Sequence, residues 1–220
     1  MDQTALVAKT AHFIKDKLSG AEAAHDWWHV YRVWQAAKTI AAKEKGGDML
    51  TVELGALLHD IADWKFHDGD LTAGPKQARA WLKSLSVAEP IAESVVEIVE
   101  HISYRGGTNT HVMEILEGKI VQDADRLDAL GAIGIARTFT FGGSRGRPLY
   151  DPDTPPKQYK DFKEYQAKIE GTPTINHFYE KLLLLKDKMN TPTGRAMAEQ
   201  RHAYMEAFLA EFYGEWEGKR

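Results

Sequence analysis

The chain has 220 residues, of which 43% are hydrophobic and 27% are charged, a composition ordinary for a soluble globular protein and long enough for one well-filled domain. The net charge of −4 argues against a general nucleic-acid binder, which would carry a basic excess. The sequence contains no cysteine, which excludes disulfides and thiolate metal sites, so any bound metal must use nitrogen and oxygen ligands.

The start of the chain, Met1-Asp2-Gln3-Thr4, lacks the basic and apolar regions of a signal peptide. No apolar run approaches the roughly 18 residues that a membrane span needs. These features, together with the lack of cysteine, favour a cytoplasmic protein with neither a membrane nor a nucleic acid polymer as its partner. The apolar residues of the last predicted helices are compatible with a monomer or a homodimer.

Apolar residues recur at helical spacing along most of the chain, and strand signals are nearly absent, so we expect an all-α fold. We expect it to form a single domain over residues 1–220, with no internal repeat. Glycine and proline mark a long loop at 140–157, because they are the strongest local breakers of helices. The predicted helices cover residues 4–18, about 27–45, 50–64, a stretch opened by Pro75, a stretch from Pro90 to about Ile102, 112–116, 118–138, and then about 158–169, 173–189 and 192–215 within the C-terminal region 158–215.

One polar pair stands out in the third predicted helix. His59 and Asp60 lie side by side in the stretch Leu54–Ala62, whose other seven residues are apolar or glycine. Burying an imidazole and a carboxylate costs several kcal/mol unless strong interactions replace their hydration. Both groups are metal ligands, so a bound cation would replace that hydration well. We therefore expect His59 and Asp60 to bind a buried metal.

Two other helices carry polar residues in apolar surroundings. His29 lies in the predicted helix at 27–45, and Asp125 lies in the apolar stretch Ile120–Leu130. Neighbouring residues of a helix point about 100° apart, so His59 and Asp60 can share an ion only at a crevice between helices. Such a crevice would draw its remaining ligands from adjacent helices, as metal sites in helical bundles do.

These stretches resemble the HD-domain phosphohydrolase superfamily. The pattern His29-x-x-Arg32-Val33, then Leu57-Leu58-His59-Asp60-Ile61, then Ala124-Asp125-Arg126-Leu127 carries the resemblance. The longer forms His25-Asp26-Trp27-x-His29-Val30 and Val121–Asp128, with Thr174–Lys181, are similar to the branch of small, single-domain bacterial HD hydrolases. The resemblance implies an HD-type helical bundle whose four metal ligands are His29, His59, Asp60 and Asp125, with Asp123 and Asp128 as less favoured substitutes.

The resemblance also implies metal-dependent hydrolysis of nucleotides, with nucleoside (deoxy)triphosphates cut to monophosphate and pyrophosphate. A divalent ion with two nitrogen and two carboxylate ligands keeps positions open for water and phosphate oxygens. We expect manganese, with iron, cobalt, nickel, zinc or magnesium as alternatives. HD proteins with two metals carry extra histidines before the last aspartate, and here only His101 is suitably placed, so we expect one ion.

Further site residues follow from spacing and charge. Asp63, four residues after His59, is a candidate base for the attacking water, with a surface aspartate as the alternative. Lys65 is a candidate for phosphate binding, with a solvated lysine at the helix end as the alternative. Arg32 is a candidate for phosphate binding or for a structural pairing with Asp128 or Asp123. His25 could line the site or orient a ligand. Arg145 and Arg147, in the glycine- and proline-rich loop, are candidates for binding a polyphosphate, because guanidinium groups match phosphate geometry, with an exposed, solvated loop as the alternative.

Asn176 and His177 could contact the base or a phosphate of the substrate. For Arg126 we expect a structural role. Three other functions stay open: a nucleoside monophosphate phosphatase, a non-catalytic ligand-binding or sensor module on the same fold, and an oxygen-using di-iron enzyme. The intact set of four ligands argues against the sensor, and the shortage of histidines between residues 61 and 124 argues against the di-iron enzyme.

Overall fold

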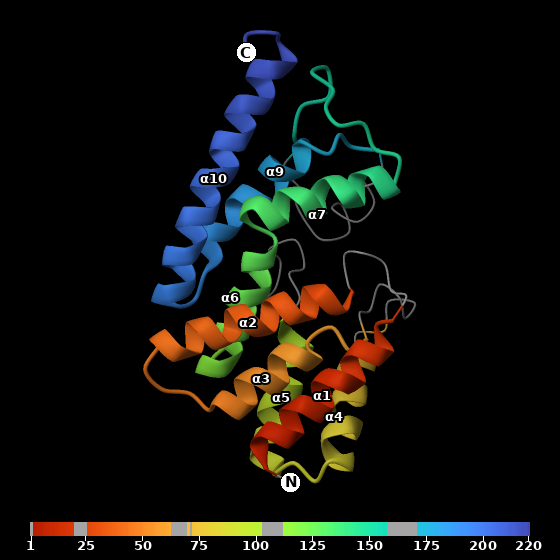
Figure 1. The fold of residues 1–220 in the computed structure, drawn as a ribbon, viewed down its shortest axis with the longest axis vertical. Coiled ribbons are helices and arrows are strands. Elements are labelled where there is room, and N and C mark those ends of the chain that lie inside the picture. Colours follow the sequence, from red (N-terminus) through yellow and green to blue (C-terminus); the bar gives the residue numbers. More distant parts are fainter. Residues whose placement is uncertain (1, 20–25, 63–69, 71, 103–111, 158–170) are drawn as a thin grey trace. The chain divides into compact units, whose positions relative to one another are not determined.

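The structure, a computed structural model, describes residues 2–19, 26–62, 70, 72–102, 112–157 and 171–220. Every regular element in these ranges is helical, which confirms the predicted all-α fold (Figure 1). The chain divides into two compact units, Met1–Tyr104 with Asn109–Asp125, and Arg105–Thr108 with Arg126–Arg220. The single domain expected from the sequence stays a prediction. No helix in the described ranges combines the length and the apolar character that a bilayer span requires.

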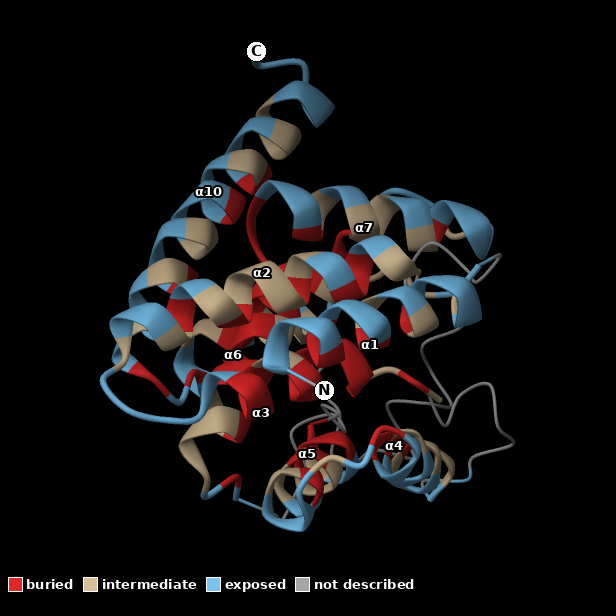
Figure 2. Ribbon diagram, turned by 60° about the horizontal axis from the view of Figure 1, so that its bottom comes forward, coloured by how far each residue is buried: buried red, intermediate tan, exposed pale blue. Residues whose placement is uncertain are grey.

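The first unit is built around a short, almost wholly buried helix, α3. Of its ten residues, only Met49 and Glu53 are not buried, and its neighbours are α1, α2 and α5. Because the surrounding helices need to bury only one side, α1 is exposed along one face and buried along the other (Figure 2). The elements of this unit are α1 (Gln3–Lys17), α2 (Trp27–Lys43), α3 (Met49–Leu58), α4 (Ala73–Ser84), α5 (Glu89–His101) and most of α6 (Leu116–Asp128).

Aspartates fix where the first three helices begin. The carboxylates of Asp2, Asp26 and Asp48 each accept a hydrogen bond from the backbone N–H three residues later, at 2.8–2.9 Å. These bonds satisfy donors that a helix leaves unpaired at its start. The start of α5 has Pro90 in its first turn, where the missing N–H costs nothing.

The second unit consists of α7 (Gly131–Ser144), α9 (Asn176–Glu180), the 3₁₀ helix η2 (Leu182–Lys188) and α10 (Pro192–Trp216). The long helix α10 packs against α7 and η2. Three phenylalanines meet between the helices of this unit. The rings of Phe178 and Phe208 stack with centroids 5.9 Å apart, and Phe139 contacts both. Apolar burial of this kind holds the unit together.

Most predicted helices are confirmed, but several boundaries are wrong. The helix predicted for 50–64 ends at Leu58, so His59 and Asp60 lie in the turn that follows it. The N–H of Ile61 bonds to the carbonyl of Leu58 over three residues, which tightens the chain into this turn. Asp63, predicted to lie on the same face as the pair, lies outside the described residues, and its placement stays a prediction.

The helix predicted for 118–138 is two helices. α6 ends at Asp128, and α7 begins at Gly131, whose φ of +71° is a left-handed conformation that favours glycine. The predicted start of the loop at residue 140 is also wrong, because α7 continues to Ser144 and the loop begins after it.

Three other predicted helices differ from the structure or are not tested by it. In the predicted helix 112–116, residues 112–115 are not helical, and Leu116 is the first residue of α6. The one predicted for 173–189 is α9 followed by η2, and the one predicted for 158–169 lies outside the described residues.

Candidate metal centre

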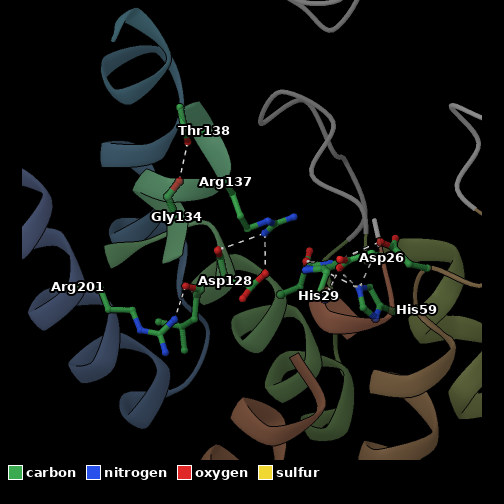
Figure 3. Close-up of polar contacts among 11 residues, drawn as sticks. Asp26, His29, His59, Asp128, Gly134, Arg137, Thr138 and Arg201 are labelled. Atoms are coloured by element: carbon green, nitrogen blue, oxygen red, sulfur yellow. Dashed lines mark hydrogen bonds and ion pairs between the residues drawn. The ribbon is translucent and has the colours of Figure 1, made fainter. Parts of the chain in front are cut away.

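His29 is placed by the start of α2. It lies in the first turn of the helix, where its backbone N–H donates to the carboxylate of Asp26 at 2.9 Å (Figure 3). Its side chain is buried, with 2% of the residue exposed. A capped first turn is better ordered than a frayed one, so the capping bond limits where the imidazole can lie.

His59 is oriented by a hydrogen bond to the helix that precedes it. Its Nδ1 lies 2.7 Å from the carbonyl oxygen of Ala56. A carbonyl can only accept, so Nδ1 carries the proton and, in the neutral ring, Nε2 presents a lone pair. This Nε2 lies 3.2 Å from Nε2 of His29. Histidines that bind metals commonly donate their other N–H to a carbonyl or carboxylate in this way.

Two carboxylates approach the same pair of nitrogens. Oδ2 of Asp60 lies 3.5 Å from Nε2 of His29 and 3.8 Å from Nε2 of His59. Oδ1 of Asp125, in the last turn of α6, lies 3.5 Å and 4.0 Å from the same two atoms. His29, His59 and Asp125 each offer one ligand atom, and these atoms lie within 4.8 Å of one another. The structure therefore brings together all four residues predicted to bind the metal.

The geometry and chemistry of this group fit one divalent ion. Bonds of about 2.0–2.2 Å from one ion would put adjacent ligand atoms about 3 Å apart and opposite ones about 4 Å apart. The separations from each imidazole nitrogen, 3.2 to 4.0 Å, fall in this range. Two carboxylates would balance the charge of such an ion, and the more exposed side chain of Asp125 leaves one side accessible to solvent.

The other candidates of the first unit are only partly described. Asp63, Lys65 and His25 lie outside the described residues, and the assignment of roles to them stays a prediction. Arg32 lies in α2, one turn after His29, and is half-buried. His101 is not part of the group of ligand-type side chains found in the described ranges. Its carbonyl instead accepts a long bond, 3.5 Å, from the side chain of Gln122 in α6.

Arg145 and Arg147 lie just after α7 in the second unit. Both guanidinium groups lie over the ring of Phe141, at 5.5 Å and 5.2 Å from its centroid. Such cation–π contacts hold the two cations near one another, on the same aromatic ring.

The neighbouring α9 carries Asn176 and His177. The Asn176 side chain donates to the carbonyl of Thr154 at 2.8 Å, so it anchors the loop as well as being a candidate ligand for substrate. Burial, together with the smaller effect of the nearby charges of Lys181 and Arg147, lowers the pKa of His177 to about 3. His177 is therefore neutral over the physiological range.

Sequence reasoning missed a set of contacts at the end of α6. Arg137 donates to the carboxylate of Asp128 at 2.7 Å (Figure 3). Arg126, for which a structural role was predicted, donates to the carbonyl of Lys188. Nothing in the sequence pairs Arg137 with Asp128, because the break between α6 and α7 was not predicted. Asp123 is fully buried in α6.

Comparisons with known proteins agree with this geometry. The HD domain family model matches residues 27–130. The Bacillus subtilis protein "Uncharacterized protein YpgQ" is 37% identical over 200 residues, which are 90% of this chain and 88% of that protein. The crystal structure of an HD-superfamily hydrolase from Bacillus thuringiensis is 42% identical, covers 98% of this chain and 99% of its own, and has a TM-score of 0.77.

The crystal structure of Bacillus subtilis YpgQ in complex with ADP covers 98% of this chain and 97% of its own, with 32% identity and a TM-score of 0.77. The residues matched by the family model include the two histidines and the two aspartates of the metal centre. The likeness to whole chains confirms the predicted branch of small HD hydrolases. The chain therefore belongs to the HD domain family and is a metal-dependent phosphohydrolase of that superfamily.

Proposed function

We propose that the protein hydrolyses nucleoside (deoxy)triphosphates to the monophosphate and pyrophosphate, with manganese bound by His29, His59, Asp60 and Asp125. The observation that carries the proposal is the convergence of these four side chains, with 3.2 Å between the two imidazole nitrogens. A relative with 32% identity binds ADP in its crystal structure, which supports a nucleotide as the substrate. Two imidazoles with two carboxylates suit manganese better than magnesium, which prefers oxygen ligands.

Two hydrogen bonds support the positions of the two histidines of the proposed centre. Asp26 orders the first turn of α2, and Ala56 fixes the tautomer of His59, so both imidazole nitrogens point to one place. When bound there, a divalent ion supplies an acidified water and neutralises charge that develops on the phosphoryl group. The proposed role of Asp63 is to orient the attacking water and accept its proton.

Cationic and amide side chains are proposed to bind the substrate. Lys65, Arg32, Arg145 and Arg147 are the candidates for the phosphates, and His25, Asn176 and His177 for the remainder. Nδ1 of His177 and Oδ1 of Asn176 are buried and have no hydrogen-bond partner among the described residues, which supports a role in binding a ligand. A neutral His177 can donate or accept a hydrogen bond with a base or a sugar.

A panel of nucleotides with added manganese tests the proposal, with phosphate and pyrophosphate measured separately. We expect triphosphates to release pyrophosphate and no inorganic phosphate. Release of phosphate from monophosphates alone would identify a nucleoside monophosphate phosphatase instead. A lack of turnover across the panel, in protein that binds nucleotide, would indicate a ligand-binding module.

The joint substitution Arg145→Ala and Arg147→Ala tests the phosphate grip. We expect KM for a triphosphate to rise at least tenfold, since several charge-assisted bonds to the phosphate chain would be lost. The affinity for a monophosphate should change much less. Arg195→Ala, which removes an arginine elsewhere in the same unit, is the control. Equal losses for triphosphate and monophosphate would contradict the grip.

A further inference from the structure

The C-terminal end of α6 is bound by arginines from two other helices of the second unit. Arg137 of α7 donates to the carboxylate of Asp128 at 2.7 Å and to its backbone carbonyl at 3.2 Å. Arg201 of α10 donates to the carbonyl of Leu127 (Figure 3). The last carbonyls of a helix lack partners inside the helix and carry partial negative charge. Two guanidinium groups therefore pair with backbone carbonyls in the last turn of α6 and offset their partial negative charge.

The break after α6 is shaped to admit one of these arginines. Gly131, with its left-handed φ of +71°, opens α7, and an added Cβ there would lie 3.1 Å from Cγ and 3.2 Å from Cβ of Arg201. The side chain of Arg201 thus runs directly past Gly131 to reach the carbonyl of Leu127. A larger residue at position 131 would displace it.

Asp128 links the two arginines electrostatically. Its residue is 4% exposed, so its carboxylate needs a cation close by. Arg137 provides one in direct contact, and the charge of Asp128 also acts on Arg201, where it opposes the lowering of the pKa caused by burial. The contacts make a compact charged network, and its breakage would remove the Arg137 guanidinium from a buried carboxylate.

Asp125 lies in the same last turn, three residues before Asp128. Residues three apart lie on one side of a helix, one above the other. A shift of this turn would therefore move the Asp125 carboxylate, which lies 3.5 Å from Nε2 of His29. Ligands of a metal are sensitive to such support, and loss of a supporting contact commonly costs 10–100-fold in affinity.

We propose that Arg137 and Arg201 are positioning residues, which hold the last turn of α6 so that the Asp125 carboxylate stays in place for the metal. This inference rests on the proposed metal centre, and it assigns neither arginine a contact with substrate. It accounts for the two cations at one helix end and for the glycine that lets Arg201 reach it.

The test is the affinity of the purified protein for manganese, measured by the electron paramagnetic resonance signal of the free ion. We expect Arg137→Gln to weaken binding about tenfold or more. Arg201→Gln should act in the same direction. Arg195→Gln is the matched control, because Arg195 lies on the same α10 and also donates to a carbonyl, that of Met189 at 3.4 Å. Its affinity for manganese should equal that of the unaltered protein.

A role in folding alone gives a different result. Both arginine variants would then melt at a lower temperature yet bind manganese as tightly as the unaltered protein, and that outcome would overturn the proposal. If Arg137→Gln does not fold, the isosteric Asp128→Asn removes the charged contact and is judged by the same criterion. If the unaltered protein binds no manganese, that result contradicts the proposed function itself. Normal binding that is lost in His59→Ala but kept in the arginine variants refutes the positioning role alone.

Discussion

Asp26 is not one of the four proposed metal ligands, yet it lies directly before the helix turn that carries His29. In the sequence, Asp26 belongs to the stretch His25-Asp26-Trp27-x-His29-Val30 that resembles the HD hydrolases, and that pattern assigns it no role of its own. In the structure it caps α2 through the N–H of His29. The signal that could have found this role is general: an aspartate directly before a helix commonly caps it.

We expect Asp26→Ala to lower the free energy of unfolding by about 1 kcal/mol and also to weaken manganese binding. The second effect follows because the loosened turn carries His29. Asp2→Ala is the control, since Asp2 caps α1 in the same way but touches no ligand. Chemical denaturation and metal titration of both variants measure the two effects. Equal manganese affinities in both variants would contradict the coupling.

His177 makes stability depend on pH in a defined window. The ring has a pKa of about 3 when folded and an ordinary value of 6.5 when unfolded, so the unfolded chain binds the extra proton between these values. Stability due to the neutral ring is complete above pH 6.5 and is lost as the pH falls toward 3, by up to about 1.4 kcal/mol per pH unit.

The substitution His177→Asn removes this dependence while keeping a polar side chain. We expect the free energy of unfolding of the variant to fall less steeply with pH than that of the unaltered protein between about pH 4 and pH 6. Urea denaturation across that range measures the two slopes. Parallel slopes would show that His177 titrates normally in the folded protein.

At the scale of helices, the break between α6 and α7 sets the geometry of the second unit. Gly131 adopts a backbone conformation that costs other residues roughly 1–2 kcal/mol, and Arg201 occupies the space beside it. Gly143, near the end of α7, has nothing within 4 Å of an added Cβ and no unusual φ. Substitution by alanine is therefore expected to change the free energy of unfolding in opposite directions at the two glycines.

We expect Gly131→Ala to lower the free energy of unfolding by more than 1 kcal/mol, through backbone strain and the displacement of Arg201. Gly143→Ala should instead raise it by about 0.5–1 kcal/mol, because alanine favours a helix over glycine. Denaturant unfolding of the two variants measures both values. A stabilising Gly131→Ala would mean that the conformation at the break is not as described.

Helix boundaries were predicted correctly where apolar periodicity agreed with a start or stop signal. They were predicted wrongly where only the periodicity was visible. α1 and α10 have clear boundaries, such as Pro192 directly after the capping Thr191. The apolar run through Ile61 suggested a longer α3. The helix instead ends at Leu58, where the His59 side chain bonds back to the carbonyl of Ala56 and the chain enters a tight turn. Small residues at 129–134 read as a helix favouring close packing, whereas Gly131 starts a new one.

The group of candidate ligands was predictable because isolated polar groups are conspicuous in an apolar sequence and because their pattern resembles that of the HD hydrolases. The spatial convergence of His29 with His59 was not visible in helical spacing, since it depends on how α2 and α3 pack. The arginines that support α6 escaped prediction for the same reason. Charged residues on helix surfaces are common, and only the tertiary structure shows that Arg137 faces a buried carboxylate.

For the whole molecule, the ligands span the sequence from residue 29 to residue 125 and lie at three helix ends. His29 begins α2, His59 follows α3, and Asp125 lies in the last turn of α6. The contacts that join these three residues are long-range, so the group comes together only when the three helices have packed. An ion bound there would in turn stabilise that packing, because it binds the folded chain and not the unfolded one.

The most direct test of the central claim is the metal content of the purified protein after manganese loading, measured together with its turnover of a nucleoside triphosphate. We expect about one ion per chain in the unaltered protein, and loss of both the ion and turnover in His59→Ala and in Asp60→Ala, because each substitution removes a ligand of one site. Full metal occupancy with normal turnover in either variant would contradict the account.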